Sequence, residues 1–338
     1  MGVTAKELAK IMNLSEAAIS MALNNKPGVS TKTRKAVLEA ADKYGYDFTK
    51  IQDIAPVDTT KGVITMIIYK KHGAIVTDTP FFSQLSEGIE IGCRKNRYIL
   101  NIKYIFEGDD VEEVISEIIR FGNKGIILLG TEMQKSDFRI FEECSLPMVI
   151  LDTYYEGCSK DCVMINNVQG AYLAATHLIR SCKKQPGYLR SSYRINNFEE
   201  RADGFYKAIR ENGMSSANSI VHNLSPSMDG AYGDMKNIIK SGETLSECYF
   251  ADNDLIAAGA LKALKEEGYL IPKNISIVGF DNMPICTYME PTLSTINVPK
   301  QYMGEFSITR LVDLIENPLS EPVKIEVGTK LIKRNSTK

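Results

Sequence analysis

The sequence predicts an all-α unit at the N-terminus, followed by an α/β core of two doubly wound parallel-sheet subdomains. Within the first 46 residues, apolar side chains recur three times at helical spacing, each time after a residue type that caps helices. From Gly62 onward, short β-branched runs alternate with helical stretches, as in parallel sheets covered by helices on both faces. Roughly 230 residues of this alternation favour two sheets, with a ligand cleft at the carboxyl ends of their strands.

The three N-terminal helices are predicted from their caps. Thr4 and Glu7 form a capping box, Ser15 precedes the second helix, and Ser30 or Thr31 precedes the third. The side chains expected to face inward are those of Ala5, Leu8, Ala9, Met12, Ile19, Ala22, Leu23, Val37, Leu38, Ala41 and Tyr44. Short helices, the first two joined by a tight turn, match a DNA-binding helix-turn-helix headpiece. A small helical dimerisation module has the same periodicity, so the pattern alone leaves both open.

Strands and helices alternate through the rest of the chain. The predicted strands are Val63–Tyr69, Tyr98–Tyr104, Ile126–Leu129, Met148–Leu151, Val163–Ile165, Gly187–Arg190, Ile220–Asn223, Glu247–Ala251 and Ile275–Val278. The predicted helices include Phe82–Lys95, Val111–Phe121, Val168–Arg180, Glu199–Asn212 and Leu255–Glu267. We therefore expect a headpiece at 1–48, a hinge or linker at 49–61, and an effector-binding and dimerisation domain at 62–338. Its subdomains are expected at 62–166 with 291–320, and at 167–290 with 321–338.

Composition and charge fit a cytoplasmic protein with a DNA-contacting tip. The 40 Lys and Arg residues nearly balance the 42 Asp and Glu residues, but residues 1–50 carry eight basic and five acidic side chains, a net +3, which leaves −5 for the remainder. The apolar run Val63–Tyr69 is too short to span a bilayer, and no basic segment followed by an apolar run opens the chain. The seven cysteines include no Cys-x-x-Cys pair, which favours free thiols over a zinc site.

The residues of the headpiece themselves favour DNA binding. Val3-Thr-Ala-Lys-Glu-Leu-Ala9, Leu14-Ser-Glu-Ala-Ala-Ile-Ser20, Leu23-Asn-Asn-Lys-Pro-Gly-Val-Ser30, Thr33-Arg-Lys-Ala-Val-Leu-Glu-Ala40 and Tyr44-Gly-Tyr46 resemble the headpiece of the lactose/galactose-repressor (LacI/GalR) family. The resemblance covers nearly every position from 3 to 46. It implies that the second helix is the recognition helix in the major groove.

The resemblance also implies which headpiece residues meet DNA. The predicted DNA-binding residues are Thr4, Ser15, Glu16, Ala17, Ser20, Met21, Asn24, Ser30, Thr33 and Tyr46. Met21 departs from the family, because many members carry Arg or His there, whereas methionine packs on a base, for example on a thymine methyl group, and donates no hydrogen bond. Glu16 is able to accept from a cytosine amino group. We therefore expect a half-site unlike that of the Arg-bearing members.

The connector is the weakest part of the resemblance. Family members continue with an Asn-led segment and an Ala-Arg-x-Leu tract that folds into a hinge helix and wedges leucines into the minor groove. Here the candidate hinge residues are Thr49 as a cap and Ile54 and Ala55 near the wedge position, while Asp53 stands where the family has Arg. Two interpretations stay open: Ile54 is a shifted wedge, or the segment is a plain tether. The carboxylate of Asp53 beside phosphates favours the tether.

In the core, the resemblance implies a periplasmic-binding-protein-like fold with an effector cleft. It runs through Thr79-Pro-Phe-Phe82, Ile165-Asn-Asn167, Ala251–Gly259, Ile275–Asn282 and Pro291–Thr295. The predicted effector-binding residues are Phe81, Phe82, Asp152, Asn197, Arg201, Asn253 and Asp281. Aromatic faces suit the C–H side of a sugar, and the polar groups suit hydroxyls. The structural alternatives are that one phenylalanine belongs to the core, that Asp152 caps a loop, and that Asp254 caps the next helix.

The sequence thus predicts a transcriptional regulator, most simply a repressor, that binds duplex operator DNA as a homodimer under control of a small effector, with a sugar favoured. No leucine-heptad tail follows the core, so we expect a dimer rather than a tetramer assembled through such a tail. No phosphate-binding glycine loop and no His-Glu-x-x-His motif is present, so we expect no enzyme, cofactor or metal. The alternatives are a sugar-binding protein whose headpiece does not read DNA and an enzyme that uses the cleft. We expect the effector to alter the angle between the subdomains and thereby operator affinity.

Overall fold

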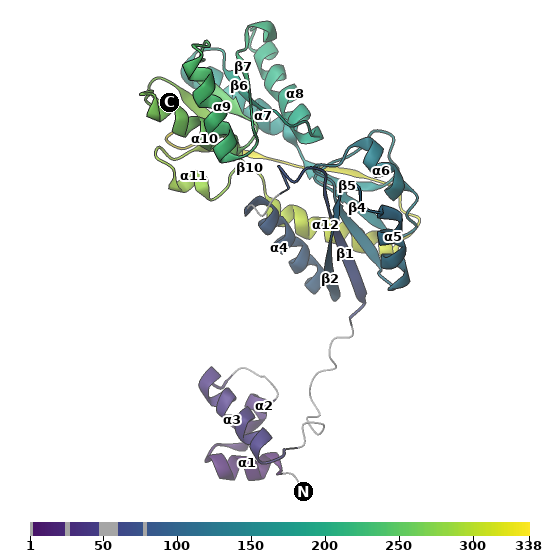
Figure 1. The fold of residues 1–338 in the computed structure, drawn as a ribbon. Coiled ribbons are helices and arrows are strands. Elements are labelled where there is room, and N and C mark those ends of the chain that lie inside the picture. Colours follow the sequence, from purple (N-terminus) through teal and green to yellow (C-terminus); the bar gives the residue numbers. More distant parts are fainter. Residues whose placement is uncertain (1–2, 24–27, 47–59, 77–79) are drawn as a thin grey trace. The chain divides into compact units, whose positions relative to one another are not determined.

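The computed structural model describes residues 3–23, 28–46, 60–76 and 80–338. They form two compact units, one ending at Thr60 and one beginning at Lys61 (Figure 1). No helix in these ranges is long and apolar enough to cross a membrane. The predicted fold class is confirmed: helices alone in the first unit, and two mainly parallel sheets with helices in the second.

The N-terminal unit consists of α1 (Ala5–Met12), α2 (Glu16–Leu23) and α3 (Thr31–Lys43). The predicted capping box is present: the backbone N–H of Thr4 donates to Glu7 Oε2 over 2.7 Å, and that of Glu7 donates to Thr4 Oγ1 over 3.3 Å. The core is built from Leu8, Ala9, Ile19, Ala22, Val37 and Ala41. The prediction that Leu38 and Tyr44 face inward is wrong, since they are 40% and 41% exposed. Leu38 lies 100° around the helix from Val37, and Tyr44 follows the last helical turn.

The first half of the core is a six-stranded parallel sheet in the order β11-β5-β4-β3-β1-β2. Its strands are β1 (Gly62–Lys70), β2 (Tyr98–Phe106), β3 (Gly125–Leu129), β4 (Met148–Leu151), β5 (Asp161–Ile165) and β11 (Lys324–Val327). Helices α4 (Pro80–Lys95) and α12 (Lys300–Glu316) pack on one face, and α5 (Val111–Arg120) and α6 (Lys135–Glu142) on the other. Successive residues of β1 point alternately into the apolar core under α4 and α12 and into that under α5 and α6, which explains why the strand is apolar from Val63 to Tyr69 apart from Thr65.

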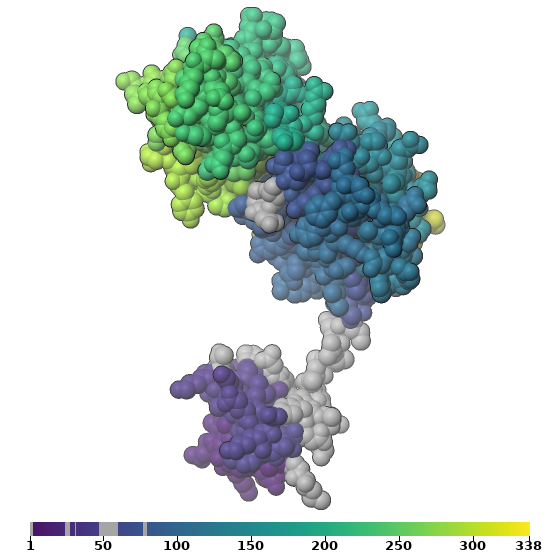
Figure 2. Space-filling model, viewed as in Figure 1, coloured from purple at the N-terminus to yellow at the C-terminus, as the bar shows by residue number. Residues whose placement is uncertain are grey.

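The second half repeats this plan with the order β12-β10-β9-β8-β6-β7, in which only the pairing of β12 with β10 is antiparallel. Its strands are β6 (Gly187–Ser191), β7 (Val221–Leu224), β8 (Cys248–Ala251), β9 (Ser276–Asp281), β10 (Ser294–Asn297) and β12 (Lys330–Ile332). Helices α7 (Asn167–Cys182) and α8 (Asn196–Glu211) cover one face, and α9 (Met228–Lys240) and α10 (Asp254–Glu266) the other. A short helix, α11, spans Ile285–Tyr288. Figure 2 shows the two halves as separate lobes of one surface.

The chain passes between the halves three times: from β5 to α7, from β10 to α12, and from β11 to β12. The predicted grouping of 291–320 with the first half and 321–338 with the second needs correction, because β10 pairs with β9 and β11 pairs with β5. These strands are four residues long and mix polar with apolar residues, so their sequences carry no sign of which sheet they join.

Helices α4 and α12 approach each other through glycines. A Cβ atom on Gly304 would lie 2.2 Å from the carbonyl oxygen of Leu85, and one on Gly88 would lie 2.0 Å from that of Gln301. Larger residues would force the backbones apart. This close contact fixes the middle of α4, one turn after Phe81 and Phe82, against the first turns of α12.

Candidate functional site

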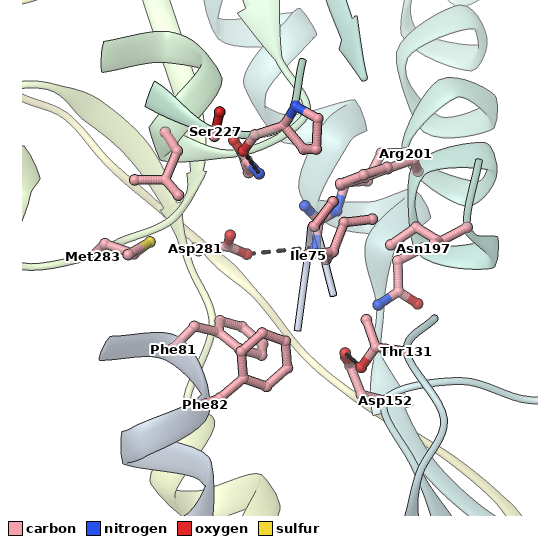
Figure 3. A pocket seen from close by; sticks show the side chains of 16 residues that line it. Ile75, Phe81, Phe82, Thr131, Asp152, Asn197, Arg201, Ser227, Asp281 and Met283 are labelled. Atoms are coloured by element: carbon pink, nitrogen blue, oxygen red, sulfur yellow. Dashed lines mark hydrogen bonds and ion pairs between the residues drawn. The ribbon is translucent and has the colours of Figure 1, made fainter. Parts of the chain in front are cut away.

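A pocket lies where the carboxyl ends of the strands of both sheets meet, and its cavity volume is about 100 Å³. The structure brings all seven predicted effector-binding residues to its lining: Phe81, Phe82, Asp152, Asn197, Arg201, Asn253 and Asp281. Figure 3 shows Asp152 and Asn197 on the side opposite Met283 and Asp281, with the two phenylalanine rings at the end of α4 between them. This location is the one expected for ligands of doubly wound sheets.

Asp152 presents an unpaired acceptor to this pocket. It follows β4 with a φ of 66°, a left-handed conformation that is uncommon outside glycine. Its Oδ2 accepts a hydrogen bond from Thr131 Oγ1 over 2.7 Å, whereas its Oδ1 has no partner among the described residues. Burial raises the pKa of this carboxyl to about 7, although the Thr131 hydroxyl, the nearby Arg201 and the Asn197 side chain lower it in part.

Asn197 adds a second such acceptor. It lies in the first turn of α8, is 3% exposed, and its Oδ1 also has no partner among the described residues. A buried polar atom without a partner is costly unless a ligand or water satisfies it. The pocket therefore offers two acceptors to a ligand that donates hydrogen bonds.

Arg201 lies one turn further along the same face of α8 and is held rigidly. It is 3% exposed; its Nε donates to Asn167 Oδ1 over 2.9 Å, one terminal nitrogen donates to the carbonyl oxygen of Asp252, and the other lies 3.4 Å from Asp281 Oδ1. The guanidinium also lies 3.8 Å from the centre of the Phe280 ring. Burial raises the pKa of Asp281, while Arg201 and Lys300 lower it. The fork of Arg201 is therefore preorganised by protein groups.

The apolar wall comes from α4. The rings of Phe81 and Phe82 lie 4.9 Å apart, edge to face at 72°. Phe81 is 7% exposed and belongs to the core cluster, whereas Phe82 is partly exposed beside it. One ring thus anchors the wall and the other offers more of its surface to a ligand, as the sequence suggested for the pair.

The capping role assigned to Asp254 is wrong by one residue. Asn253 is the N-cap of α10, because its Oδ1 accepts from the backbone N–H of Ile256 over 2.8 Å. Asp254 is fully buried and accepts from Thr295 Oγ1 over 2.5 Å and from the N–H of Met283 over 2.7 Å. Asn253 therefore lines the pocket with a side chain already engaged in the fold.

Sequence reasoning missed several lining residues, among them Ile75, Thr131, Ile195, Ser227 and Met283. Thr131 could have been predicted, since this residue comes two residues after β3, at the same sheet edge as Asp152. The others lie on connections whose paths depend on tertiary contacts.

The buried carboxyls predict a pH-dependent stability. Burial raises the pKa of Asp152 and of Asp254 to about 7 and that of Asp252 to about 6, from an ordinary value of 3.8. Between its two pKa values, such a group is protonated in the folded state and ionised in the unfolded chain. Its contribution to the free energy of unfolding is therefore complete below the pKa of the unfolded state and is lost as the pH rises through the pKa of the folded state. We expect the effector-free protein to unfold at a lower temperature at about pH 7 than at about pH 5.

Thermal unfolding followed by circular dichroism at several pH values measures this dependence. His177 and His222, whose pKa burial lowers, act in the opposite direction, so the comparison is with Asp254→Asn, which cannot ionise. The variant should show a shallower pH dependence than the wild type. Equal slopes in both proteins would contradict the assignment of a raised pKa to Asp254.

In the headpiece, the structure places Glu16, Ala17 and Ser20 on the exposed face of α2. Met21 is half-buried, and its Sδ lies close to the backbone of Gly28. A Cβ atom on Gly28 would lie only 2.7 Å from that sulfur. Arg34 donates to the carbonyl oxygen of Met21 over 3.3 Å and so closes the end of α2. The predicted reading face is therefore presented by a helix fixed at its C-terminus.

Three of the predicted DNA-binding residues are at helix N-termini, where backbone N–H groups attract anions. Thr4 caps α1, Ser15 Oγ accepts from the N–H of Ala18 over 3.1 Å, and Ser30 Oγ accepts from the N–H of Thr33 over 3.0 Å. Tyr46 packs partly against the headpiece core. Asn24 and the hinge candidates Thr49, Ile54 and Ala55 lie outside the described residues.

These features define a class of protein: a two-lobed ligand-binding core of the periplasmic-binding-protein type, joined in one chain to a helix-turn-helix. The family model of the periplasmic binding protein-like domain matches residues 175–337. The HTH-type transcriptional regulator GalS of Salmonella typhimurium is 30% identical over 308 residues, which cover 90% of this chain and 88% of that protein. The HTH-type transcriptional repressor PurR of Actinobacillus pleuropneumoniae is 26% identical over 340 residues, which cover 99% and 98%.

Solved structures show the same similarity. A LacI family transcriptional regulator from Enterococcus faecium, with bound ribose, is 27% identical and matches with a TM-score of 0.69, covering 81% of this chain and 98% of that one. The chain belongs to the LacI/GalR family of transcriptional regulators, as its headpiece residues indicated. It is a DNA-binding regulator controlled by an effector.

Proposed function

We propose that the chain acts in the cytoplasm as a homodimeric repressor that binds a neutral monosaccharide in the pocket between its two lobes. The seven pocket residues named above form the effector site, and the exposed face of α2 with the caps of α1, α2 and α3 forms the DNA site. Occupation of the pocket changes the affinity of the headpieces for operator DNA, with a coupling of about 5- to 150-fold.

The two unpaired acceptors carry the proposal. Asp152 Oδ1 and Asn197 Oδ1 are buried at the pocket and lack partners among the described residues. Sugar hydroxyls supply the missing donors, and the ring of Phe82 suits the C–H face of a pyranose or furanose. Because Arg201 already contacts Asn167, Asp252 and Asp281, little positive charge is left for an anion. A neutral ligand is therefore favoured over a phosphorylated one.

The size of the pocket agrees with this class of ligand. Its volume of about 100 Å³ is small beside sites for larger organic ligands, which supports a monosaccharide rather than a longer saccharide. The Enterococcus faecium relative contains ribose. D-Ribose and D-galactose are accordingly the first compounds to test.

An exposed sheet edge supports the homodimer. Strand β2 lies at the end of its sheet and exposes Ile99, Ile102, Tyr104 and Phe106, which are 43–54% exposed. An apolar edge strand of this kind invites pairing or cover by another chain. A second copy that presents the same surface would cover it symmetrically.

Ligand binding tests the proposal. At about 100 times its dissociation constant, a ligand stabilises the folded protein by about 2.7 kcal/mol, which for a chain of this size raises the unfolding temperature by about 4 °C. We expect this shift with D-ribose or D-galactose, and none with D-ribose 5-phosphate or hypoxanthine. Asp152→Ala should abolish it. The bound sugar should also change the affinity for an operator obtained by binding-site selection.

Two results would contradict the proposal. Tighter binding of the sugar phosphate or of hypoxanthine would overturn the neutral-sugar assignment. Sugar binding without any change in operator affinity would favour a sugar-binding protein whose headpiece does not serve regulation.

A further inference from the structure

A buried carboxylate beside the pocket binds the backbone of residues 71–76. Glu132 follows β3 by three residues, and its side chain is completely buried. It accepts hydrogen bonds from five backbone N–H groups: Lys71, His72 and Gly73 donate to Oε2 over 2.9, 3.1 and 2.8 Å, and Ile75 and Val76 donate to Oε1 over 2.8 Å each. One side chain thus satisfies most of the backbone donors of residues 71–76.

The carboxylate is ionised there. Burial by itself would raise its pKa, but the backbone N–H groups of Val76, Ile75, Gly73 and His72 together hold the pKa of Glu132 below its ordinary value. Hydrogen bonds to a charged acceptor are stronger than those between neutral groups. The contact therefore strongly favours one conformation of the loop.

That loop is a wall of the pocket. Residues 71–76 connect the end of β1 to the segment before α4 and contain no helix or strand. Ala74 and Ile75 line the pocket together with residues of α8. The preceding residue, Thr131, also orients a pocket group, because its hydroxyl donates a hydrogen bond to Asp152. Two consecutive residues after β3 thus hold two sides of the same cavity.

The loop also reaches the other lobe. The His72 ring lies 4.6 Å from that of Tyr193, tilted by 55°, and Tyr193 belongs to the connection between β6 and α8 in the second half. Nearby, Asn196 Nδ2 donates to Thr153 Oγ1 over 3.1 Å and to the carbonyl oxygen of Tyr154 over 2.9 Å. The two lobes therefore meet at two points beside the pocket, and the first depends on the loop that Glu132 orders.

We propose that Glu132 is a positioning residue for effector binding, which fixes loop 71–76 as a wall of the pocket and as the first lobe's half of a contact with Tyr193 that holds the cleft closed. This inference rests on the proposed function insofar as the pocket is the effector site. The ordering of the loop itself requires no ligand.

Hydrogen exchange of the effector-free, full-length protein tests the ordering. In Glu132→Gln the amide nitrogen must face backbone donors, so part of the five hydrogen bonds is lost without a change in size. We expect the peptide covering residues 71–76 to exchange about 10- to 100-fold faster, with other peptides unchanged. The matched control is Asp161→Asn, a buried carboxylate far from the pocket whose Oδ1 accepts from Arg310 Nε over 2.7 Å and from the N–H of Val323 over 3.0 Å.

Binding of D-ribose and D-galactose by calorimetry is the second measurement. Whichever sugar binds the wild type should bind Glu132→Gln about 10- to 100-fold more weakly, and it should also bind Tyr193→Ala more weakly. Asp161→Asn should lower the unfolding temperature and leave the affinity intact. If Glu132→Gln does not fold, Glu132→Asp, which keeps the charge but shortens the reach, should show the same changes to a smaller degree.

Unchanged exchange of residues 71–76 in a folded Glu132 variant would overturn the inference, as would unchanged sugar affinity. A wild type that binds neither sugar would count against the proposed effector class alone. The exchange measurement would still decide what Glu132 does.

Discussion

Arg201→Ala is expected to abolish effector binding and to lower the free energy of unfolding by about 3–5 kcal/mol, the usual cost of removing one partner of a buried ion pair. The guanidinium is the group that joins Asn167 of α7, the backbone of Asp252 after β8 and the carboxylate of Asp281 at the end of β9. Its loss leaves Asp281 buried without its main counter-charge. The pocket then loses both a binding group and the element that aligns its second lobe.

Calorimetry with the sugar identified by the thermal screen and chemical unfolding measure the two effects. Arg190→Ala is the matched control, because Arg190 pairs with Glu199 over 2.8 Å on the more exposed side of the same lobe. That variant should retain ligand binding and lose at most about 1 kcal/mol. Arg201→Lys should regain stability only in part, since an ammonium group cannot make the three divergent contacts of the fork. Wild-type affinity in Arg201→Ala would refute the assignment of the pocket.

Ser20→Glu is expected to weaken operator binding by about 10- to 100-fold while leaving effector binding unchanged. Ser20 is exposed on α2, between Glu16 and the C-terminal end of the helix. If this face enters the major groove as proposed, a carboxylate at position 20 is repelled by the phosphates and replaces a hydroxyl able to bond a base edge. Because the headpiece is a compact unit separate from the core, the substitution should not alter the pocket.

Ala36→Glu on α3 is the control, since it adds the same charge at an exposed position that is not among the predicted DNA contacts. Both variants are compared by fluorescence anisotropy on the selected operator over a range of salt concentrations. The Ser20 variant should lose affinity at every salt concentration, and the Ala36 variant should stay within about threefold of the wild type. Equal losses in the two would mean that net charge, and not the face of α2, governs binding.

The sequence by itself was sufficient to predict the three helices of the headpiece and the alternation of strands and helices in the core. Caps at Thr4, Ser15 and Ser30 are local interactions, made by a side chain with backbone only three residues away, so they can be seen in the order of residues. The long apolar strands are equally local signals, because a strand buried on both faces is apolar along nearly its whole length. The seven pocket residues could be predicted through the resemblance to a family.

Tertiary structure decided what depends on distant partners. Strands β10 and β11 join sheets that their own four residues do not specify, and Asn253, rather than Asp254, caps α10 because Asp254 is drawn to Thr295 and Met283. Glu132 is the clearest case. In the sequence it is one acidic residue after a strand, and only the fold brings residues 71–76, some 60 positions earlier, within reach of its carboxylate. Charges and hydrogen bonds act over a few ångströms in space, and the order of residues alone does not reveal such distances.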